Sequence, residues 1–579
     1  MNRSLPDPHR QPAAAFLEYE PIPLEFGTSG LRGLVKDITD LEAYINVKSA
    51  LRYLLAQGDI VAGSSVVIAG DLRPSTDRIL LASTQAIVDV GCQVENAGKI
   101  PTPALINHAI ATGRAGVMVT GSHIPFDRNG IKINKAAGEL LKTDEPGILR
   151  AVEHTRAEEY GRAELSSPFD ASGMFKQTPS LPPIDGRAEA AYVQRYLSSF
   201  AHDALRGFRI LVYQHSAVGR DILARILRGL GADVVCAGRS ETFVALDTEN
   251  VSDEQLDRLE QLAAGAVGSG PPFDAIVSTD GDSDRPLLAA VLTKDEAGPN
   301  GRRVRLTPGD MLGIVVAEYL RAEVAVVPIS ANDAVERRMR ERGVSLHTTK
   351  IGSPYVISAI DEVKRAKKHT RIVGWEANGG FLTGSEITLA SGSSLPALPT
   401  RDAMLPIVAN LVSAAEQGTG LSAVWNQLPA RFGRAGLLDG VPTAISRGLL
   451  ARFVPAGDLV EVDYTLPTGL VGRNRQTSNR APLAAAEAAP WYELRERLAR
   501  VFTPTLGFDD IVRINVLDGV RSYFRNGDVA HVRPSGNAPQ LRIYANADSQ
   551  ARADQIVALG LHEPDGMLRE LVRVVGAMG

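Results

Sequence analysis

Apolar positions along the chain recur in blocks whose spacing alternates between a helical and an extended period. In the first block, a helix-like segment is followed by a strand, a second helix and two further strands. The expected elements are a helix at 41–57, a strand at 65–69, a helix at 77–90, and strands near 94 and at 116–120. This alternation predicts α/β construction with a mainly parallel or mixed sheet.

Two more blocks repeat the alternation, and the tail beyond about residue 430 departs from it. The second block is expected to contain a helix at 187–200, a strand at 208–213, a helix at 219–230, a strand at 233–236 and an apolar run at 273–278. The third is expected to contain helices at 311–321 and 332–342 and strands at 324–329 and 370–374. The tail shows short strands at 459–464, 511–516, 529–533 and 541–545, with a helix at 492–501. We therefore predict three α/β units and a distinct α+β tail.

Two segments fall outside these blocks. Residues 1–24 are expected to form an extended arm, and the segment 155–186, rich in Pro, Ser, Glu and Arg, is interpreted as a linker or surface excursion. No residue-level repeat connects the three blocks, so their similarity is architectural.

Bulk properties narrow the class of protein. A chain of 579 residues exceeds one hydrophobic core, and 44% hydrophobic with 22% charged residues is ordinary globular composition. The net charge of -5, without a basic block, argues against nucleic acid as a partner. The two cysteines, Cys92 and Cys236, lack metal-ligand spacing. With no secretory signal and no long apolar span, we expect a cytoplasmic protein that is not membrane-bound. The oligomeric state is not predicted.

The stretch TGSHIP carries the first candidate for chemistry. Ser122 follows an apolar run at 115–119 and stands three residues before Pro125. Chemistry favours this arrangement where a hydroxyl must be presented rigidly as a nucleophile. An ordinary polar turn explains the same residues.

The stretch STDGDSDRP carries the second candidate. Its three alternating acids follow an apolar run, and they are Asp280, Asp282 and Asp284. Carboxylates so close together repel one another unless a hard cation lies among them. An EF-hand loop is excluded, because its sixth and twelfth positions are Arg285 and Val291. Three protein oxygens leave positions open for substrate phosphate, as Mg²⁺ prefers, whereas a solvated acidic loop is the alternative.

Two further loops show weaker patterns. RPSGNAPQLR predicts an anion-binding loop, formed by Arg533, Ser535, Gly536, Asn537 and Arg542, although a surface turn is as good an explanation. GWEANGGF places Glu376 and Asn378 on a glycine-rich loop that suits sugar hydroxyls, with a structural turn as the alternative. GTGLSA lacks the strand-turn-helix context of a dinucleotide site, and no Walker A sequence is present, so nucleotide binding is not expected.

Together the motifs resemble, in kind and order, the α-D-phosphohexomutase family, which includes phosphomannomutases, phosphoglucomutases and phosphoglucosamine mutases. They are FGTSGLRG at 26–33, TGSHIP at 120–125, DGDSDRP at 280–286, EANGG at 376–380 and RPSGNAP at 533–539. The resemblance covers residues 22–579. It differs from the usual T-A-S-H-N-P loop at Gly121 and Ile124, from the G-E-x-S-G-H loop in lacking its serine and histidine, and at Asn537-Ala538, where Thr-Glu is common.

The resemblance implies four domains around a central cleft. The implied domains are an N-terminal α/β domain with the phosphoserine loop (1–185), a metal-binding α/β domain (186–304), a sugar-recognition α/β domain (305–428) and a C-terminal phosphate-binding α+β domain (429–579). Ser122 is implied as the phosphorylated residue, whose phosphate binds Mg²⁺ together with the three acids. The implied reaction centre contains Arg32, His123, Lys132 and Arg285. Glu376 and Asn378 are implied to contact sugar hydroxyls. The 533–537 loop is implied to bind the phosphate that does not react.

The implied reaction is reversible interconversion of hexose 6-phosphate and hexose 1-phosphate, of mannose or glucose, through a hexose 1,6-bisphosphate. Lys132 is the first candidate for handling the hydroxyl proton, with its pKa depressed by nearby cations, and Lys350 is the second. A permanently charged phosphate ligand is the alternative for either lysine, and loop bracing is the alternative for His123. The open alternatives for function are a phosphoglucosamine mutase, a Mg²⁺-dependent phosphatase and a non-catalytic sugar-phosphate sensor.

Overall fold

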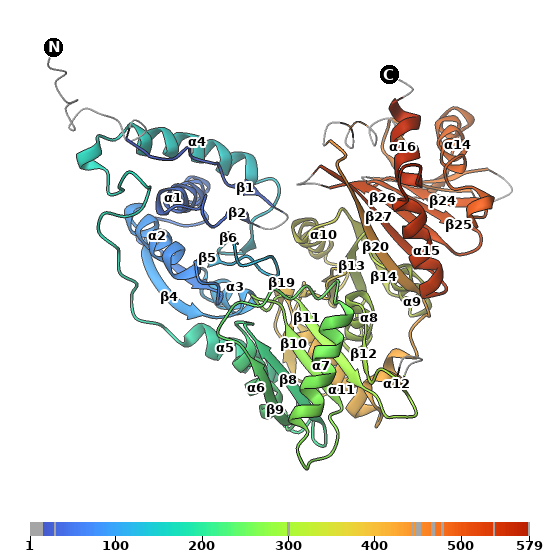
Figure 1. The fold of residues 1–579 in the computed structure, drawn as a ribbon, viewed down its shortest axis with the longest axis horizontal. Coiled ribbons are helices and arrows are strands. Elements are labelled where there is room, and N and C mark those ends of the chain that lie inside the picture. Colours follow the sequence, from blue (N-terminus) through green and yellow to red (C-terminus); the bar gives the residue numbers. More distant parts are fainter. Residues whose placement is uncertain are drawn as a thin grey trace. The chain divides into compact units, whose positions relative to one another are not determined.

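The fold is described from a computed structural model (Figure 1). It describes residues 16–576 apart from 28–29, 298–300, 443–444, 446–447, 449–452, 465–468, 476–479 and 536–538. The chain divides into two compact units. The first comprises the chain up to residue 327 with 343–347 and 352–427, and the second comprises 328–342, 348–351 and the chain from 428 onward.

The N-terminal part of the first unit is built on a mixed sheet. Its strands are β1 (Glu25–Phe26), β2 (Leu31–Leu34), β3 (Ser65–Gly70), β4 (Gln93–Lys99), β5 (Ala115–Val119), β6 (Arg128–Lys135) and β7 (Gly138–Glu139). They lie in the order β1-β2-β6-β5-β3-β4, with β7 paired to β6. Strand β3 is parallel to β4 and β5, whereas β6 is antiparallel to β5 and β2. The predicted mixed sheet is confirmed.

Two further sheets repeat this strand order. The second sheet contains β8 (Arg209–His215), β9 (Asp233–Arg239), β10 (Ala275–Thr279), β11 (Pro286–Val291) and β12 (Val304–Leu306). The third contains β13 (Val324–Pro328), β14 (Ser345–Thr349), β15 (Ile372–Trp375), β16 (Phe381–Thr383) and β19 (Leu398–Asp402). Their orders, β12-β11-β10-β8-β9 and β19-β16-β15-β13-β14, match β2-β6-β5-β3-β4 of the first sheet. The predicted similarity of three α/β blocks is therefore architectural.

The shared strand order gives three motif loops the same topological position. Strands β5, β10 and β15 each lead through a short loop into an antiparallel partner, namely β6, β11 and β16. The loops carry TGSHIP, DGDSDRP and EANGG, respectively. Each loop thus begins at the carboxyl end of a buried strand, where α/β folds commonly place binding residues.

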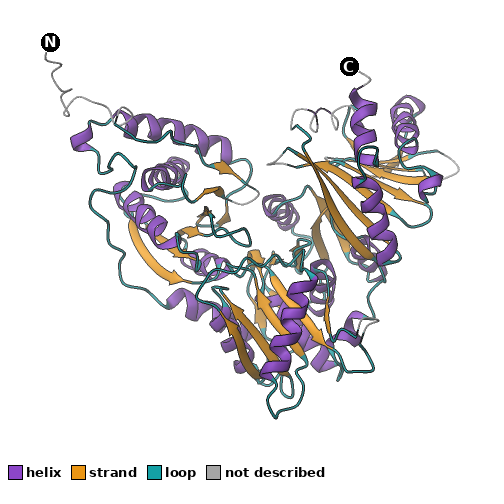
Figure 2. Cartoon of the chain, in the orientation of Figure 1, coloured by secondary structure: helices purple, strands orange, loops and turns teal. Residues whose placement is uncertain are grey.

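Helices alternate with the strands of the first unit, as Figure 2 shows in purple and orange. The helices that lie wholly in this unit are α1 (Asp40–Gln57), α2 (Thr76–Asp89), α3 (Thr102–Thr112), α4 (Glu145–Gly161), α5 (Arg187–Ser199), α6 (Arg220–Gly229), α7 (Asp253–Ala266), α8 (Gly309–Tyr319), α10 (Ser353–Arg365), α11 (Met404–Glu416) and α12 (Leu421–Trp425). The N-cap of helix α1 is Thr39, whose hydroxyl accepts the Glu42 N–H at 3.2 Å. Its C-cap is Gly58, with a left-handed φ of 79°. Helices α1, α2 and α4 share one core with the first sheet, and Leu105 of α3 packs over Gly116 on its other face.

The segment 155–186 is more ordered than predicted. Its first residues continue α4 to Gly161, and Phe169 is 1% exposed within the first core. The ring of Phe169 lies 5.4 Å from that of Tyr44, centroid to centroid, in an edge-on arrangement. The interpretation of this segment as a linker or surface excursion is wrong for these parts. Phe175 and Leu181 of the same segment also pack against this core, so a few apolar residues dock an otherwise polar loop.

The second unit is dominated by an antiparallel sheet. Its strands are β20 (Phe432–Asp439), β21 (Leu459–Asp463), β22 (Val471–Asn474), β23 (Arg480–Pro482), β24 (Ile511–Asn515), β25 (Val520–Phe524), β26 (Val529–Pro534) and β27 (Gln540–Ala547), and its helices include α9 (Asp333–Glu341), α14 (Ala485–Ala499), α15 (Gln550–Leu561) and α16 (Met567–Gly576). The order is β20-β27-β26-β25-β24-β21-β22-β23. The α+β tail is confirmed, and α14 begins earlier than predicted because the alanine-rich start favours helix.

The bounds of the four predicted domains remain predictions. Among the described helices, none combines the length and the apolar content needed to cross a membrane.

Candidate active site

Ser122 is held rigidly at the carboxyl end of β5. It is 1% exposed, and its φ of 55° is a left-handed conformation that is uncommon outside glycine. Its N–H donates to Thr120 Oγ1 at 2.8 Å, and the Thr120 hydroxyl donates to Asp71 Oδ2 at 2.8 Å. A buried serine with a strained backbone differs from an ordinary surface turn.

Arg73, which lies outside every motif, stabilises the serine loop through hydrogen bonds to its backbone. Its guanidinium donates to four carbonyl oxygens, those of Ser122 (2.9 Å), Ile124 (2.5 Å), Pro125 (2.6 Å) and Arg128 (2.9 Å). Asp71 pairs with it at 3.1 Å. A Cβ on Gly121 would lie 2.6 Å from Arg73 Cζ. The glycine that replaces the usual alanine of the family loop therefore makes room for this guanidinium.

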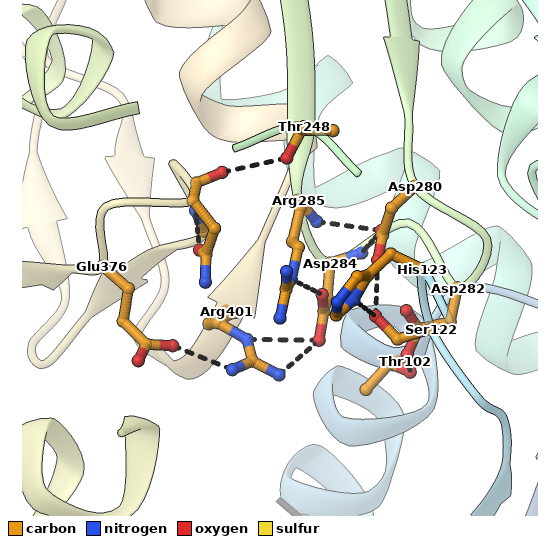
Figure 3. Close-up of polar contacts among 12 residues, drawn as sticks. Thr102, Ser122, His123, Thr248, Asp280, Asp282, Asp284, Arg285, Glu376 and Arg401 are labelled. Carbon is orange, nitrogen blue, oxygen red and sulfur yellow. Dashed lines mark hydrogen bonds and ion pairs between the residues drawn. The ribbon is translucent and has the colours of Figure 1, made fainter. Parts of the chain in front are cut away.

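The serine loop and the acidic loop meet although their residues are 158 positions apart (Figure 3). Ser122 Oγ donates to Asp280 Oδ2 at 2.6 Å. Asp280 Oδ1 accepts the backbone N–H groups of Asp284 and Arg285 at 3.1 and 3.2 Å. A Cβ on Gly281 would lie 2.5 Å from the Ser122 carbonyl oxygen. The close approach of the two loops therefore requires a glycine at position 281.

We expect Gly281→Ala to reduce turnover at least tenfold in a protein that still folds. The added methyl group must push the Ser122 loop away from the acids, and a misplacement of about 1 Å costs on the order of 100-fold in rate. Steady-state kinetics and circular dichroism check this. The matched control is Gly186→Ala, where nothing lies within 4 Å of the added carbon and φ is −75°. Wild-type turnover of Gly281→Ala would contradict the importance of this contact.

The three acids of the second loop fit a divalent cation. Each offers a ligand oxygen, and these atoms lie within 4.8 Å of one another. Asp282 Oδ1 and Asp284 Oδ1 are buried without a hydrogen-bond partner in the described part of the chain. Burial, followed by the neighbouring Asp282 and Asp284 carboxylates, raises the pKa of Asp280 well above its usual value. Buried carboxylate oxygens without a hydrogen bond and mutual repulsion are the features that a hard cation removes.

Lys132, on β6, lies against the acidic loop. Its Nζ donates to Asp282 Oδ2 at 2.7 Å and to Asp284 Oδ2 at 3.1 Å. Burial lowers the pKa of Lys132, but the two carboxylates outweigh burial and raise it above the usual value. The expected depression of this pKa by nearby cations is therefore wrong for this structure, in which Lys132 is an ammonium ion.

His123 is close to the serine hydroxyl, with Nδ1 3.4 Å from Ser122 Oγ. Burial, followed by the charges of Arg285 and Arg32, lowers the pKa of His123 to about 3. The ring is therefore neutral near pH 7. Arg32, on β2, is half-buried, and burial followed by Arg285 and Arg401 lowers its pKa. The structure thus gathers the predicted Arg32, His123, Lys132 and Arg285 around the two loops.

The third loop contributes Glu376 and Asn378, each 6% exposed. Asn378 Oδ1 accepts the Gly380 N–H at 2.9 Å, which closes the loop after β15. Glu376 Oε2 accepts from Arg401 Nη1 at 2.8 Å, and the same guanidinium contacts Asp284 (Figure 3). Sequence reasoning missed Arg401, because it lies on β19 outside every motif. The available signal was a charged pair, Arg401-Asp402, at the end of the short segment LPTRD.

The remaining predicted residues lie in the second unit. Arg533 of β26 stands directly opposite Arg542 of β27, and the Nε atoms of both are buried without a hydrogen-bond partner among the described residues. Like charges opposite one another are unfavourable without an anion. Asp518 lies 3.7 Å from Arg533 Nε and accepts the Ile351 N–H at 3.0 Å, which brings the segment containing Lys350 to the same place. Ser535 is buried, whereas Gly536 and Asn537 lie outside the described residues.

Comparisons with known proteins identify the family of the chain. Three family models match the chain: phosphoglucomutase/phosphomannomutase alpha/beta/alpha domain I at residues 23–159, alpha/beta/alpha domain III at 308–432, and the C-terminal domain at 480–559. A phosphomannomutase of Sinorhizobium fredii is 37% identical over 541 residues, covering 93% of this chain and 98% of that protein. A phosphomannomutase of Salmonella muenchen is 34% identical over 536 residues, covering 92% of this chain and 94% of that protein.

The similarity extends to solved structures. A putative phosphomannomutase from Thermus thermophilus superposes with a TM-score of 0.62 at 19% identity, covering 96% of this chain and 100% of that one, which shows the shared fold. The chain therefore belongs to the α-D-phosphohexomutase family of phosphoglucomutases and phosphomannomutases. It is a phosphohexomutase, an isomerase of carbohydrate metabolism that acts on sugar phosphate. The family resemblance and fold class predicted from the sequence are confirmed.

Proposed function

We propose that the protein interconverts hexose 6-phosphate and hexose 1-phosphate through a phosphorylated Ser122, with mannose phosphate as the main substrate and glucose phosphate as a second. The observation that carries the proposal is the 2.6 Å contact between Ser122 Oγ and Asp280 inside the buried acid cluster. The names of the Sinorhizobium fredii and Salmonella muenchen relatives support mannose.

In the proposed first step, the P–O bond of phospho-Ser122 breaks and a P–O bond forms to the free hydroxyl of the bound hexose monophosphate. The product is a hexose 1,6-bisphosphate, and the hydroxyl proton passes to a basic side chain. His123 is the proposed acceptor by its position, with Nδ1 3.4 Å from Ser122 Oγ, and the ammonium ion of Lys132 is proposed to stabilise charge. Transfer of the other phosphate back to Ser122 completes the reaction. Phosphoryl transfer leaves a protein mainly with positioning and charge stabilisation, which Arg32, Lys132 and Arg285 supply.

The three acids and phosphorylated Ser122 are proposed to hold Mg²⁺. When bound, Mg²⁺ offsets negative charge on the transferring phosphoryl group. Glu376 and Asn378 are proposed to contact sugar hydroxyls. Lys350 and the arginine loop are proposed to bind the phosphate that does not react, and the loop residues are Arg533, Ser535, Gly536, Asn537 and Arg542.

Coupled assays of mannose 1-phosphate, glucose 1-phosphate and glucosamine 1-phosphate test the proposal. Each assay includes Mg²⁺ and the matching 1,6-bisphosphate. We expect the highest kcat/KM with mannose 1-phosphate, because the Sinorhizobium fredii and Salmonella muenchen relatives are named phosphomannomutases. A higher value with glucosamine 1-phosphate would replace the substrate assignment. Steady release of inorganic phosphate would indicate a phosphatase, and binding without turnover would indicate a sensor.

A further inference from the structure

Arg401 occupies a fixed place between two loops of the site. It lies on β19, is 3% exposed, and precedes Asp402 on the same strand. Asp402 accepts hydrogen bonds from the hydroxyls of Tyr192 (2.5 Å) and Tyr196 of α5 and from the Met404 N–H (3.0 Å). Since successive side chains of a strand point to opposite faces, this cluster anchors the strand from one side while Arg401 points to the site.

The guanidinium of Arg401 bridges the metal loop and the sugar loop. Its Nε and Nη2 donate to Asp284 Oδ2 at 3.2 and 2.7 Å, and its Nη1 donates to Glu376 Oε2 at 2.8 Å. Figure 3 shows it between the two carboxylates, with dashed lines to both. A planar guanidinium holds two carboxylates in a defined geometry, which a lysine ammonium does not.

The bridge also places a positively charged guanidinium beside one carboxylate of the predicted metal cluster. Asp284 Oδ2 accepts from Arg401 and, at 3.1 Å, from Lys132. The other carboxylate oxygen, Asp284 Oδ1, has no hydrogen-bond partner within the described residues, and Arg285 Nε lies 3.8 Å from it. A divalent cation at the cluster must therefore share the charge of Asp284 with these cationic side chains. Arg401 also pairs with Glu376.

The place of Arg401 in the fold repeats that of a predicted catalytic residue. Strand β19 lies beside β16 in the third sheet, as β2, which carries Arg32, lies beside β6 in the first. Both strands pair in the antiparallel sense with the strand that leaves the motif loop, β16 or β6. Two strands in corresponding positions thus direct an arginine toward the site.

We propose that Arg401 is a positioning residue that couples the two subsites: it orients the Glu376 carboxylate for sugar hydroxyls and weakens the hold of the acid cluster on its divalent cation. The inference rests on the proposed function for the roles of Glu376 and of the cluster. Its consequence is a pair of effects with opposite signs. Loss of the guanidinium charge strengthens cation binding and weakens sugar-phosphate binding, whereas a residue that only supports the fold weakens both.

The test compares Arg401→Gln with the wild-type protein, and both are dephosphorylated for the metal-binding measurement. The Kd for Mn²⁺, measured by electron paramagnetic resonance, is expected to fall about tenfold, because a full charge is removed from beside Asp284. The KM for mannose 1-phosphate is expected to rise at least tenfold, because Glu376 loses a charge-assisted hydrogen bond. Weaker Mn²⁺ binding in Arg401→Gln would overturn the proposal.

A second variant keeps the test decisive if Arg401→Gln does not fold. Arg401→Lys retains the charge and loses the planar bridge, so we expect Mn²⁺ affinity within about twofold of wild type and a raised KM. An unchanged KM in this variant would overturn the positioning role. Arg371→Gln is the matched control, since Arg371 is 39% exposed and pairs with Glu323 at the surface.

The coupling itself is measured with a double-mutant cycle. Glu376→Gln is expected to weaken Mn²⁺ binding in the wild-type background, because it leaves Arg401 paired with Asp284 alone. In Arg401→Gln the same change is expected to have little effect on Mn²⁺ affinity, and additive effects would overturn the coupling. Absence of mutase turnover in the wild-type protein would instead refute the proposed function, and the Mn²⁺ affinities would still test the bridge.

Discussion

Ser122→Ala is expected to lose mutase turnover by roughly 1,000-fold or more, because the proposed reaction passes through this hydroxyl. Alanine also removes the 2.6 Å hydrogen bond to Asp280. Steady-state assays with Mg²⁺ and the 1,6-bisphosphate measure turnover. Intact-mass spectrometry measures the phosphorylated form, which is expected in the wild-type protein and not in the variant.

The matched control for this prediction is Ser166→Ala. Ser166 is exposed, and its hydroxyl donates only to the nearby Ala163 carbonyl at 2.9 Å. Near-normal turnover of Ser122→Ala, without any phosphorylated enzyme, would refute the phosphoserine route. The family membership and the fold would stand, and a different phosphoryl carrier would have to be sought.

Asp282→Asn is expected to reduce Mg²⁺-dependent turnover roughly 100-fold or more, because a neutral amide is a poorer ligand for a hard cation than a carboxylate. Asp282 is fully buried, and one of its oxygens has no partner among the described residues. In the wild-type protein, Mg²⁺ is expected to raise the Tm by binding the folded state, and this shift is expected to disappear in the variant. Thermal unfolding with and without Mg²⁺ measures it.

The control for the acid cluster is Asp295→Asn, an exposed aspartate that follows β11. Its turnover and its Mg²⁺-dependent Tm shift are expected to equal those of the wild type. Chelation of divalent cations gives an independent check in the unmodified protein. Full turnover after chelation would show that the buried acids serve another purpose.

The α/β blocks were predictable because their strands are buried on both faces and their helices on one. Those burial patterns appear in the sequence as a regular spacing of apolar residues. This spacing located β3, β8, β10 and β13 to within a few residues. Helix α3 was missed because most of its residues are buried, including Leu105 and Ile106. Its sequence therefore lacks the polar stripe that gives an amphipathic helix its period. The docking of Phe169 and Phe175 was missed for the opposite reason, because a few apolar residues scattered through a polar loop have no period.

Within the site, the motif residues were predictable where one short loop carries the chemistry. The three aspartates follow one strand, and their spacing alone indicated a cation site. Arg73 and Arg401 were not predictable, because each acts on residues far away in the chain. The direction of the Lys132 pKa shift was also wrong, since it depends on how close two carboxylates come. Such distances arise only when β6 packs against the acidic loop.

Local pattern was sufficient for the class of fold, the order of the blocks and the positions of the candidate loops, since each rests on residues near one another in the chain. The contact of Ser122 with Asp280, the need for glycine at 281, and the Arg401 bridge between Asp284 and Glu376 depend on packing between separate sheets. Charge and steric interactions act over a few ångströms. Their partners are therefore set by how the strands meet in space.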